Sequence, residues 1–350
     1  MSIKLLFKKI IQNSLLLSNL SAFFLYPFYR NKNWINEPLE YFVKGNLPYN
    51  KKIYQIKKDL FISKYHYKTL PSEYFLYNFP LLNDYGKKQF VGEIEVAESF
   101  KKIGTSKTAL LFRNKYQCYK FFGKYYNRDV IQLPSNDGLS LFNDFLSRNK
   151  KFVVKPIDQS CGRGVYIINI ETETCTSREL YERIIKNGDC VVEGYIAQVK
   201  EMACWHPDSV NTIRIVTFTN DQKVCILFSV LRIGRNGKCV DNGGSGGILA
   251  SVDLETGIVS SNGVTEDNEE YICHPNSGIQ ITGFKVPLWK NAIDLVTELS
   301  LLVPEQPLVG WDLALTDKGW IMVEGNRIPS FMIKQITDKK GLRYLMNKLL

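Results

Sequence analysis

The chain has 350 residues, of which 45% are hydrophobic and 23% charged, a balance that excludes an intrinsically disordered chain. A chain of this length can bury a large core, as one large domain or as two to three small ones. Its formal net charge is +10, and the positive excess lies in the N-terminal part of the chain. Residues 1–150 hold 24 Lys and Arg against 11 Asp and Glu, a balance of +13. The remainder holds 21 against 24, a balance of −3.

The basic excess has two interpretations. It can form a surface for anionic partners such as phosphates, lipid headgroups or nucleic acid, or it can be a soluble face without a partner. The sequence has no zinc-finger spacing, helix-turn-helix signature or RNA-recognition motif, so we expect no nucleic-acid partner. The eight cysteines lack C-x-x-C pairs, and two of them, Cys190 and Cys225, lie in apolar strand-like runs typical of core residues. This usage favours a reducing cytoplasm over a disulfide framework.

The first 30 residues form a separate question. Lys8 and Lys9 precede an apolar run from Leu15 to Pro27, which polar residues interrupt. The run is shorter than the roughly 20 apolar residues that a membrane-spanning helix needs. It can pack on its own domain, which we prefer, or lie as a basic amphipathic helix on an anionic membrane face. We therefore expect a cytoplasmic protein and leave open peripheral contact with the inner membrane face through residues 1–30.

Helical and irregular patterns dominate the first 150 residues, and no repeat is present. A helix is expected over Glu93–Ile103, a short strand over Ala109–Phe112 and another strand over Val130–Leu133. After residue 150 strands dominate, with helices expected near Ser177–Lys186 and Leu288–Leu301. The expected strands are Phe152–Lys155, Val165–Ile168, Cys190–Glu193, Thr212–Thr219, Val224–Ile233 and a closing pair around Asp317-Lys318-Gly319. This order predicts an α+β fold with mainly antiparallel hairpins, and no Walker A or Rossmann glycine pattern is present.

A glycine-rich loop follows the strand that carries Lys155. The loop contains Gly162, Arg163 and Gly164 and leads into the next strand. Backbone N–H groups of such a hairpin can close over phosphates, because glycine permits close approach. Lys155 would supply a fixed positive charge beneath the loop. A plain hairpin with a glycine-rich turn is the alternative.

Another apolar strand ends in Glu193 and continues into Gly194, Tyr195 and Ile196. Backbone groups of such a segment can bond the edge of an adenine ring while the carboxylate meets its exocyclic amine. Many strands end in Glu, so the pattern by itself is not specific.

Two arginines lie within apolar strands, Arg214 and Arg232, and a second glycine-rich loop follows, beginning at Asn242. Arginines that are buried need anionic partners. Solvent-facing side chains and a long hairpin turn are the alternatives for each feature taken alone.

The closing pair of strands carries acidic residues where a core strand should avoid them. Glu324 and Asn326 are two residues apart and therefore project to the same side of a strand. Pairing about the turn can place Asp312 opposite them. Three oxygen ligands on neighbouring strands suit a Mg²⁺ ion that keeps its other positions for water and phosphate oxygens. Ordinary edge strands with solvated acids are the alternative.

Taken in order, these residues resemble the ATP-grasp superfamily, and most closely its sugar-transfer-associated branch, predicted enzymes found with cell-surface polysaccharide genes. The resemblance extends from about Leu70 to the C-terminus. Within the superfamily, the chain also resembles alpha-L-glutamate ligase and D-alanyl-D-alanine ligase type enzymes. Its motifs are Asn114-Lys115, Arg128, V-V-K-P (153–156), G-R-G-V (162–165), V-V-E-G-Y-I-A-Q (191–198), S-V-N-T-I-R-I-V-T (209–217), L-R-I-G (231–234), V-D-N with G-G-I (240–242, 246–248), G-W-D (310–312) and E-G-N-x-x-P (324–329).

The resemblance implies an ATP-grasp fold, in which two α+β subdomains grip ATP between antiparallel sheets, after an N-terminal helical or irregular region. The implied divisions are 1–70 (helical and basic), 71–150 (pre-ATP-grasp and linker), 151–200 (lid with the glycine loop) and 201–350 (C-terminal subdomain with the metal ligands).

The resemblance also implies the roles of single residues. Lys115 and Lys155 would contact the nucleotide phosphates, and the loop Gly162–Gly164 would cover them. Glu193 and the backbone of Gly194–Ile196 would hold adenine. Asp312, Glu324 and Asn326 would bind two Mg²⁺ ions, with Mn²⁺ as a substitute. Arg232 and Asn242 would act near the transferred phosphoryl group, and Arg214 would do the same or hold the substrate carboxylate. The ribose contact stays open between Gln198 and Glu201.

The implied activity is an ATP-dependent carboxylate–amine ligase that forms an acylphosphate, acting on small-molecule carboxylate and amine co-substrates linked to a surface-glycan precursor. Two alternatives stay open: a kinase that phosphorylates a sugar or polyol hydroxyl, and a non-catalytic membrane-surface protein on the same scaffold. His66, His206 and His274 form no catalytic constellation and are expected to be structural.

Overall fold

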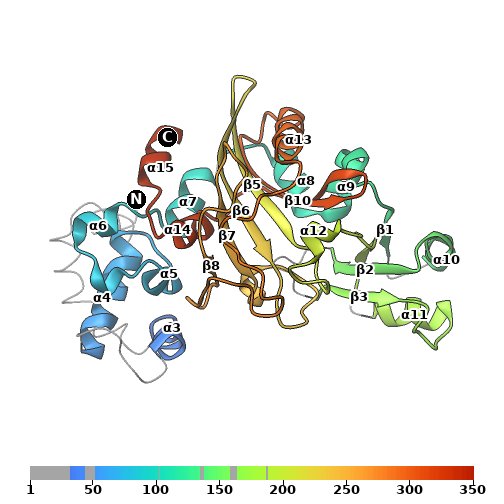
Figure 1. Ribbon diagram of the computed structural model, residues 1–350, viewed down its shortest axis with the longest axis horizontal. Helices are drawn as coiled ribbons and strands as arrows, with labels where there is room; N and C mark the ends of the chain where they lie inside the picture. The colour runs from blue at the N-terminus through green and yellow to red at the C-terminus, as the bar shows by residue number, and fades with distance from the viewer. Residues whose placement is uncertain (1–31, 44–51, 102, 135–137, 158–163, 187) are drawn as a thin grey trace. The chain divides into compact units, whose positions relative to one another are not determined.

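The computed structural model describes residues 32–43, 52–101, 103–134, 138–157, 164–186 and 188–350 (Figure 1). Residue contacts divide the chain into two compact units. One comprises residues 1–101, 267–269 and 330–350, and the other comprises 102–266 and 270–329. The apolar run of residues 1–30 and the loop residues Gly162 and Arg163 lie outside the described residues. Within the described part, no helix has the length and apolar character needed to cross a membrane.

The first unit is mainly helical where it is described. The sequence predicts this for its N-terminal part, whereas the helices after residue 330 were not predicted. Its helices are α3 (Asn33–Val43), α4 (Ile53–His66), α5 (Pro71–Leu76), η1 (Phe79–Leu81), α6 (Asp84–Lys88), α7 (Glu93–Phe100), α14 (Met332–Asp338) and α15 (Arg343–Leu349). The C-terminal helices belong here because two buried polar side chains bond them to the earlier ones. The Gln335 amide exchanges two 2.8 Å hydrogen bonds with the backbone of Val91. The Glu93 carboxylate accepts from the backbone N–H groups of Phe331 and Met332, at the start of α14.

A four-stranded antiparallel sheet begins the second unit. Its order is β1 (Val130–Leu133), β4 (Cys190–Gly194), β2 (Lys151–Pro156) and β3 (Tyr166–Asn169). Helices α10 (Leu139–Arg148) and α11 (Ser177–Ile185) supply Phe142, Phe145 and Leu180 to the core beneath it. α11 begins at a capping box in which Thr176 and Glu179 bond each other's backbone N–H.

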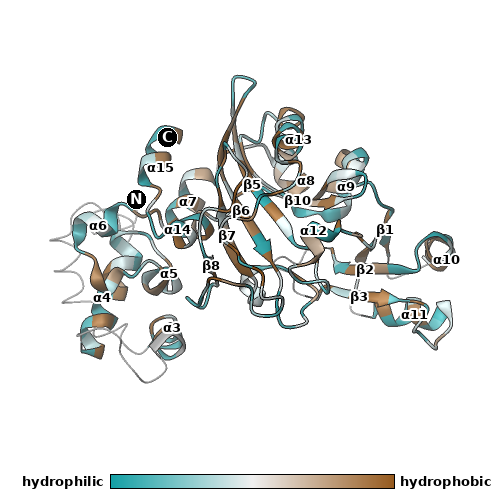
Figure 2. Cartoon of the chain, in the orientation of Figure 1, coloured by the Kyte–Doolittle hydropathy of each residue, from teal (hydrophilic) through white to brown (hydrophobic). Residues whose placement is uncertain are grey.

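A seven-stranded antiparallel sheet forms the rest of the second unit. Its order is β11 (Gly319–Asn326), β10 (Leu308–Thr316), β5 (Thr212–Asn220), β6 (Lys223–Ile233), β7 (Ile248–Val252), β8 (Gly263–Val264) and β9 (Glu270–Tyr271). Hydrophobic segments run along its central strands (Figure 2). Helix α13 (Trp289–Leu301) packs Val296 and Leu299 into the core that also holds the fully buried Trp311. The remaining elements are α8 (Ser106–Arg113), α9 (Lys115–Phe122), η2 (Gly123–Tyr125), α12 (Lys200–Ala203) and η3 (Gly243–Ser245).

Most of the predicted elements are confirmed, and two expectations are wrong. The apolar run Ala109–Phe112 is helical, within α8, because Thr105 and Thr108 form a reciprocal cap that begins a helix at Ser106. A four-residue apolar run fits either state. Cys190 is buried as expected, whereas Cys225 is exposed near the β5–β6 hairpin. The seven cysteines in the described part of the chain are all free thiols.

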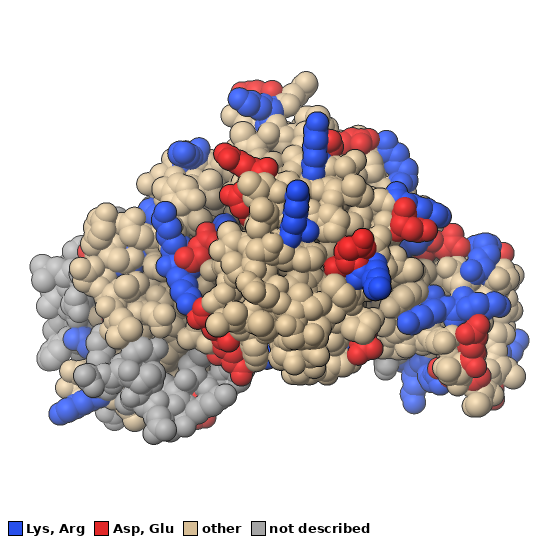
Figure 3. All heavy atoms as spheres, viewed as in Figure 1, with Lys and Arg blue, Asp and Glu red and all other residues tan. Residues whose placement is uncertain are grey.

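The charged surface does not separate the two interpretations of the basic excess. On the face drawn in Figure 3, basic and acidic side chains lie beside one another instead of forming a patch of one sign. We therefore expect the residues that bear on function among the buried charges.

Candidate functional site

The two acidic strands pair as the sequence predicts. β10 and β11 are antiparallel, with Asp312 opposite Glu324 and Gly310 opposite Asn326, and the register shifts by one residue just after Asp312. Asp312 is 1% exposed, whereas the Glu324 side chain keeps 47% of its surface exposed. The β10–β11 pair therefore presents one buried and one accessible carboxylate on the same face.

Both predicted arginines converge on Asp312. Arg214 is its register partner across β5 and β10, and its Nε and Nη2 donate to the two Asp312 oxygens at 2.7 and 2.6 Å. Arg232 reaches the same carboxylate from β6, with Nη1 2.6 Å from Oδ2. Arg232 Nη2 also lies 3.3 Å from a carboxylate oxygen of Asp241. We name these four residues together with Glu324 and Asn326 the Asp312 cluster.

The charges within the Asp312 cluster shift the pKa values of Asp312 and Glu324 in opposite directions. Burial alone would raise the pKa of Asp312, yet the guanidinium groups of Arg214 and Arg232 hold it well below its ordinary value. The pKa of Glu324 shifts in the opposite direction. It is raised first by partial desolvation of the carboxyl group and then by the negative charge of Asp312 opposite it. Asp312 is therefore a permanent anion, whereas a further positive charge nearby would favour ionisation of Glu324.

The donor set of the Asp312 cluster fits Mg²⁺. Its acids Asp241, Asp312 and Glu324 outnumber its two arginines by one, so the cluster carries a formal charge of −1. The Asn326 amide makes only long contacts there, 3.5 Å to Asp312 Oδ2 and 3.4 Å to Glu324 Oε1. Among the described residues, no group of three His, Cys, Asp or Glu side chains could hold a metal ion. Two carboxylates and an amide oxygen nevertheless match the oxygen ligands that this cation takes alongside water and phosphate.

A second buried acid lies on the smaller sheet and is held by two cations. Glu193 Oε1 is 2.9 Å from Lys155 Nζ, and Oε2 accepts from Nε and Nη2 of Arg128 at 2.9 and 2.7 Å. Burial by itself would raise the pKa of Glu193, but the charges of Lys155 and Arg128 lower it to about 2. We name these three residues the Glu193 cluster. Both carboxylate oxygens are engaged, so contact of Glu193 with an adenine amine stays a prediction.

The remaining nucleotide-directed residues flank the Glu193 cluster. Lys115 is the first residue of α9, and its Nζ donates to the carbonyl of Pro156 at 3.0 Å, directly after Lys155. Two backbone N–H groups of the predicted adenine segment are in use, because Gly194 donates to Asp129 and Tyr195 to Lys151. Gly164 is exposed with a φ of +68°, a conformation that favours glycine.

Other predicted residues have local roles in the structure. Asn242 caps η3, with its Oδ1 accepting from Gly244 N at 2.9 Å. Gln198, one of the two ribose candidates, exchanges hydrogen bonds with the backbone of Asn211. His206 and His274 are buried beside this region, and burial lowers the pKa of both.

Sequence reasoning missed the roles of Arg128 and Asp241. Both stand within the quoted motifs, but no local pattern shows that Arg128 meets Glu193, 65 residues away. Asp241 accepts from the backbone N–H of Thr212 at 3.0 Å and also from its hydroxyl group, which leaves it beside Arg232. Arg128 precedes β1 and Asp241 lies between β6 and β7, so no strand pattern marked either residue, and their pairing required the fold.

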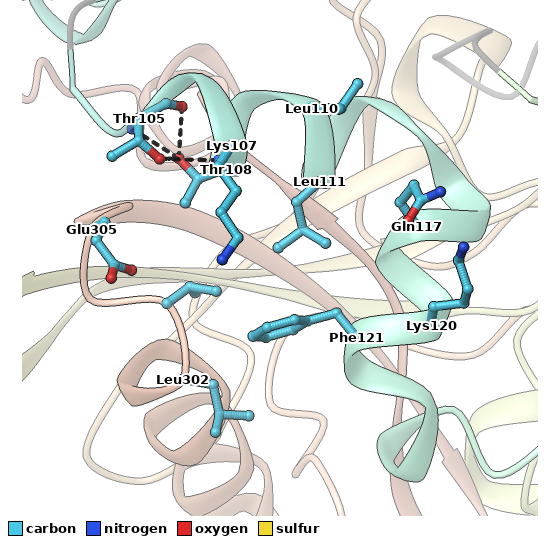
Figure 4. A pocket seen from close by; sticks show the side chains of 11 residues that line it. Thr105, Lys107, Thr108, Leu110, Leu111, Gln117, Lys120, Phe121, Leu302 and Glu305 are labelled. Carbon is cyan, nitrogen blue, oxygen red and sulfur yellow. Dashed lines mark hydrogen bonds between the residues drawn. The ribbon is translucent and has the colours of Figure 1, made fainter.

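Two hollows lie apart from these clusters. One, of about 630 Å³, is lined by residues of α8 and α9 and by residues 302–305. Figure 4 shows Lys107, Phe121 and Leu302 around it. The other, of about 660 Å³, lies on α8 beside Arg327 and Ile328. No residue of the Asp312 or Glu193 clusters lines either hollow, so neither bears on the chemistry of those clusters.

Comparison with known proteins gives a family match. The sequence matches the model described as sugar-transfer associated ATP-grasp over residues 100–349, and a comparison with curated proteins finds no match. Among solved structures, the chain is similar to the D-alanine-D-alanine ligase from Coxiella burnetii, with 11% identity, a TM-score of 0.45, and coverage of 73% of this chain and 63% of that one. It is also similar to the L-amino acid ligase from Bacillus licheniformis, with 15% identity, a TM-score of 0.42, and coverage of 69% of this chain and 46% of that one. A third similar structure is the N5-carboxyaminoimidazole synthetase from Staphylococcus aureus complexed with ADP, with 10% identity, a TM-score of 0.41, and coverage of 70% of this chain and 53% of that one. The chain spans less than two thirds of the length of each of these three proteins.

Proposed function

The chain belongs to the sugar-transfer associated ATP-grasp family, and from this premise we propose that it is an ATP-dependent carboxylate–amine ligase acting on a surface-glycan precursor. The glycan context is supported by the family description alone. The chemistry is supported by one observation above all: the buried Asp312 carboxylate binds Arg214 and Arg232 and faces Glu324 across the β10–β11 pair.

In this proposal Asp312, Glu324 and Asn326 hold Mg²⁺, with two ions expected and Mn²⁺ as a substitute. When bound, the metal offsets the negative charge of the β- and γ-phosphates during phosphoryl transfer. The two arginines fix the Asp312 carboxylate in one orientation before any ligand arrives. Such preorganisation avoids reorganisation at the moment of reaction.

The Glu193 cluster would serve the nucleotide. Lys155 and Lys115 supply positive charge near the end of β2, and the loop Gly162–Gly164 would cover the phosphates and exclude water from a labile intermediate. The backbone of Gly194–Ile196 would hold the adenine ring at the end of β4. Arg128 and Lys155 outnumber Glu193 by one charge, and a net positive cluster suits an anionic ligand.

The reaction has two steps. A carboxylate oxygen of the first substrate attacks the γ-phosphorus of ATP, the bond to the bridging oxygen breaks, and ADP leaves with an acylphosphate formed. The amine of the second substrate then attacks the acyl carbon, and phosphate leaves as the amine loses its proton. Arg232 and Asn242 would stabilise charge near the transferred group, and Arg214 would do the same or bind the substrate carboxylate.

A screen of carboxylate and amine pairs, coupled to ADP release, tests this function. The proposal expects ADP release that needs both co-substrates and Mg²⁺, with an amide and phosphate as the other products. A stable phosphorylated alcohol formed from one substrate would contradict it and assign a kinase. Nucleotide binding without any turnover across the screen would favour a non-catalytic role.

A further inference from the structure

Arg128 is a buried charge that contributes to the net charge of the Glu193 cluster but has no role in the proposed reaction steps. Its side chain is 4% exposed, and its guanidinium touches both sheets of the second unit. On the smaller sheet it binds Glu193 Oε2 with two nitrogens. On the larger sheet its Nη1 donates to the carbonyl of Met322 at 2.8 Å, within β11. The same nitrogen also donates to the carbonyl of Tyr126.

The two cations of the Glu193 cluster differ in how firmly they are held. Arg128 makes hydrogen bonds to four different residues, Glu193, Tyr126, Met322 and Val323. Its guanidinium carbon lies 4.5 Å from the centroid of the Tyr126 ring. Lys155 forms an ion pair with Glu193, and its side chain is 15% exposed. Arg128 is therefore the fixed partner of the carboxylate, and Lys155 is the partner that can leave.

We propose that Arg128 is a positioning residue that keeps Glu193 neutralised, so that the Lys155 ammonium group can exchange Glu193 for the phosphates of a bound nucleotide. The inference rests on the proposed function in one respect, namely that Lys155 binds the nucleotide. Arg128 itself touches no ligand.

The physical reason is the high free energy of an unpaired buried carboxylate. Without Arg128, Lys155 would be the sole cation beside Glu193, and moving it to a phosphate would leave the carboxylate unpaired. ATP would then bind only at the expense of that pair. With Arg128 present, the departure of Lys155 leaves a carboxylate that still accepts two charge-assisted hydrogen bonds. The low pKa of Glu193 shows that the two cations together overcome the effect of burial.

A double-mutant cycle on the full chain, with the dissociation constant of Mg-ATP measured by titration calorimetry, tests the proposal. Arg128→Gln should weaken ATP binding by about 10-fold to 100-fold, because Lys155 then stays with Glu193 and its charge-assisted contact with the phosphates is lost. Adding Glu193→Gln should restore most of that affinity, because Lys155 no longer has a carboxylate to neutralise. A double variant that binds as weakly as Arg128→Gln, or more weakly, would overturn the proposal and make Arg128 only a link between the sheets.

Arg128→Lys separates charge from shape and covers the case in which Arg128→Gln does not fold. It keeps a cation beside Glu193 but loses the fork that reaches Met322, so ATP affinity should stay within about 3-fold of the wild type. Affinity as low as that of Lys155→Gln would contradict the proposal. Arg183→Gln removes an exposed ion pair with Glu173 beside the same sheet and is the matched control, expected to bind ATP as the wild type does.

The same titrations distinguish failure of this inference from failure of the proposed function. A wild-type chain that binds no ATP contradicts the proposed function and, with it, the inference. A wild type that binds ATP, with Lys155→Gln weakened and Arg128→Gln unchanged, contradicts only the role assigned to Arg128.

Discussion

The two sheets of the second unit each hold one buried carboxylate between two cations, but the clusters differ in sign. Around Asp312, two arginines face three acids, Asp241 and Glu324 being the others. Around Glu193, Arg128 and Lys155 face a single acid. The first cluster is therefore one negative charge in excess and suits a metal cation, and the second is one positive charge in excess and suits phosphates. A magnesium nucleotide carries charges of both signs.

The largest effect on the free energy of unfolding is expected from Asp312→Asn. The substitution leaves Arg214 and Arg232 buried without their shared carboxylate, and removing one partner of a buried pair costs about 3–5 kcal/mol of unfolding free energy. Chemical unfolding measures it. The matched control is Asp144→Asn, which breaks an exposed pair with Arg148 and should cost less than about 1 kcal/mol. Equal effects of the two substitutions would show that the Asp312 cluster is not a buried charge network.

Acid should act on the Glu193 cluster in a defined pH window. The folded pKa of Glu193 is about 2 and its ordinary value 4.5, so the unfolded chain binds its proton first as pH falls. The stabilisation is complete above about pH 4.5 and is lost as pH falls toward 2, with a total on the order of 3 kcal/mol. Unfolding free energies measured between pH 2.5 and 7 should fall less steeply in Glu193→Gln than in the wild type. Equal dependence of the unfolding free energy on pH in the two proteins would contradict the low pKa of Glu193.

Lys155→Gln should weaken ATP binding by about 10-fold to 100-fold, because a charge-assisted contact with phosphate is lost. Its effect on the free energy of unfolding should be smaller than that of Asp312→Asn, since Arg128 still neutralises Glu193. Calorimetric titration with ATP measures the affinity. Lys120→Gln, at the hollow of Figure 4, is the control, and an equal loss there would mean that the effect is one of overall charge.

The smallest effect on stability is expected from Glu324→Gln. Nearly half of this side chain is exposed, and the substitution removes a negative charge beside Asp312, so the unfolding free energy should change by less than about 1 kcal/mol. The apparent affinity for Mg²⁺ in the presence of ATP should fall by about 10-fold, because one ligand loses its charge. A magnesium titration followed by protection against thermal unfolding measures this. An unchanged midpoint would exclude Glu324 as a metal ligand.

The sequence predicted what depends on local pattern. The turn at Asp317-Lys318-Gly319, with Gly319 at a φ of +103°, sets the register of the hairpin as far as Leu313. The one-residue register shift after Asp312 then brings Asp312 opposite Glu324. Alternation within β5 and β6 placed Arg214 and Arg232 in apolar strands, and burial then required anionic partners. The ATP-grasp fold and its antiparallel sheets are confirmed.

Pairings between distant segments could not be predicted. Arg214 and Asp312 are 98 residues apart, and Arg128 meets the carbonyl of Met322 across 194 residues. Such contacts are set by the packing of sheets, which leaves no periodic signal in the chain. The helix at Ala109–Phe112 was missed for a local reason, because the reciprocal cap of Thr105 and Thr108 decided between two states that the apolar run leaves equal.

We propose that the two clusters of opposite sign form one site for a magnesium nucleotide. The most direct measurement is thermal unfolding of the full chain with ATP and Mg²⁺ together and with each alone. We expect the two together to stabilise the chain by about 2.7 kcal/mol when the ligand is present at about 100 times its dissociation constant, and either alone to stabilise it much less. No stabilisation by the pair, or equal stabilisation by ATP without metal, would contradict it.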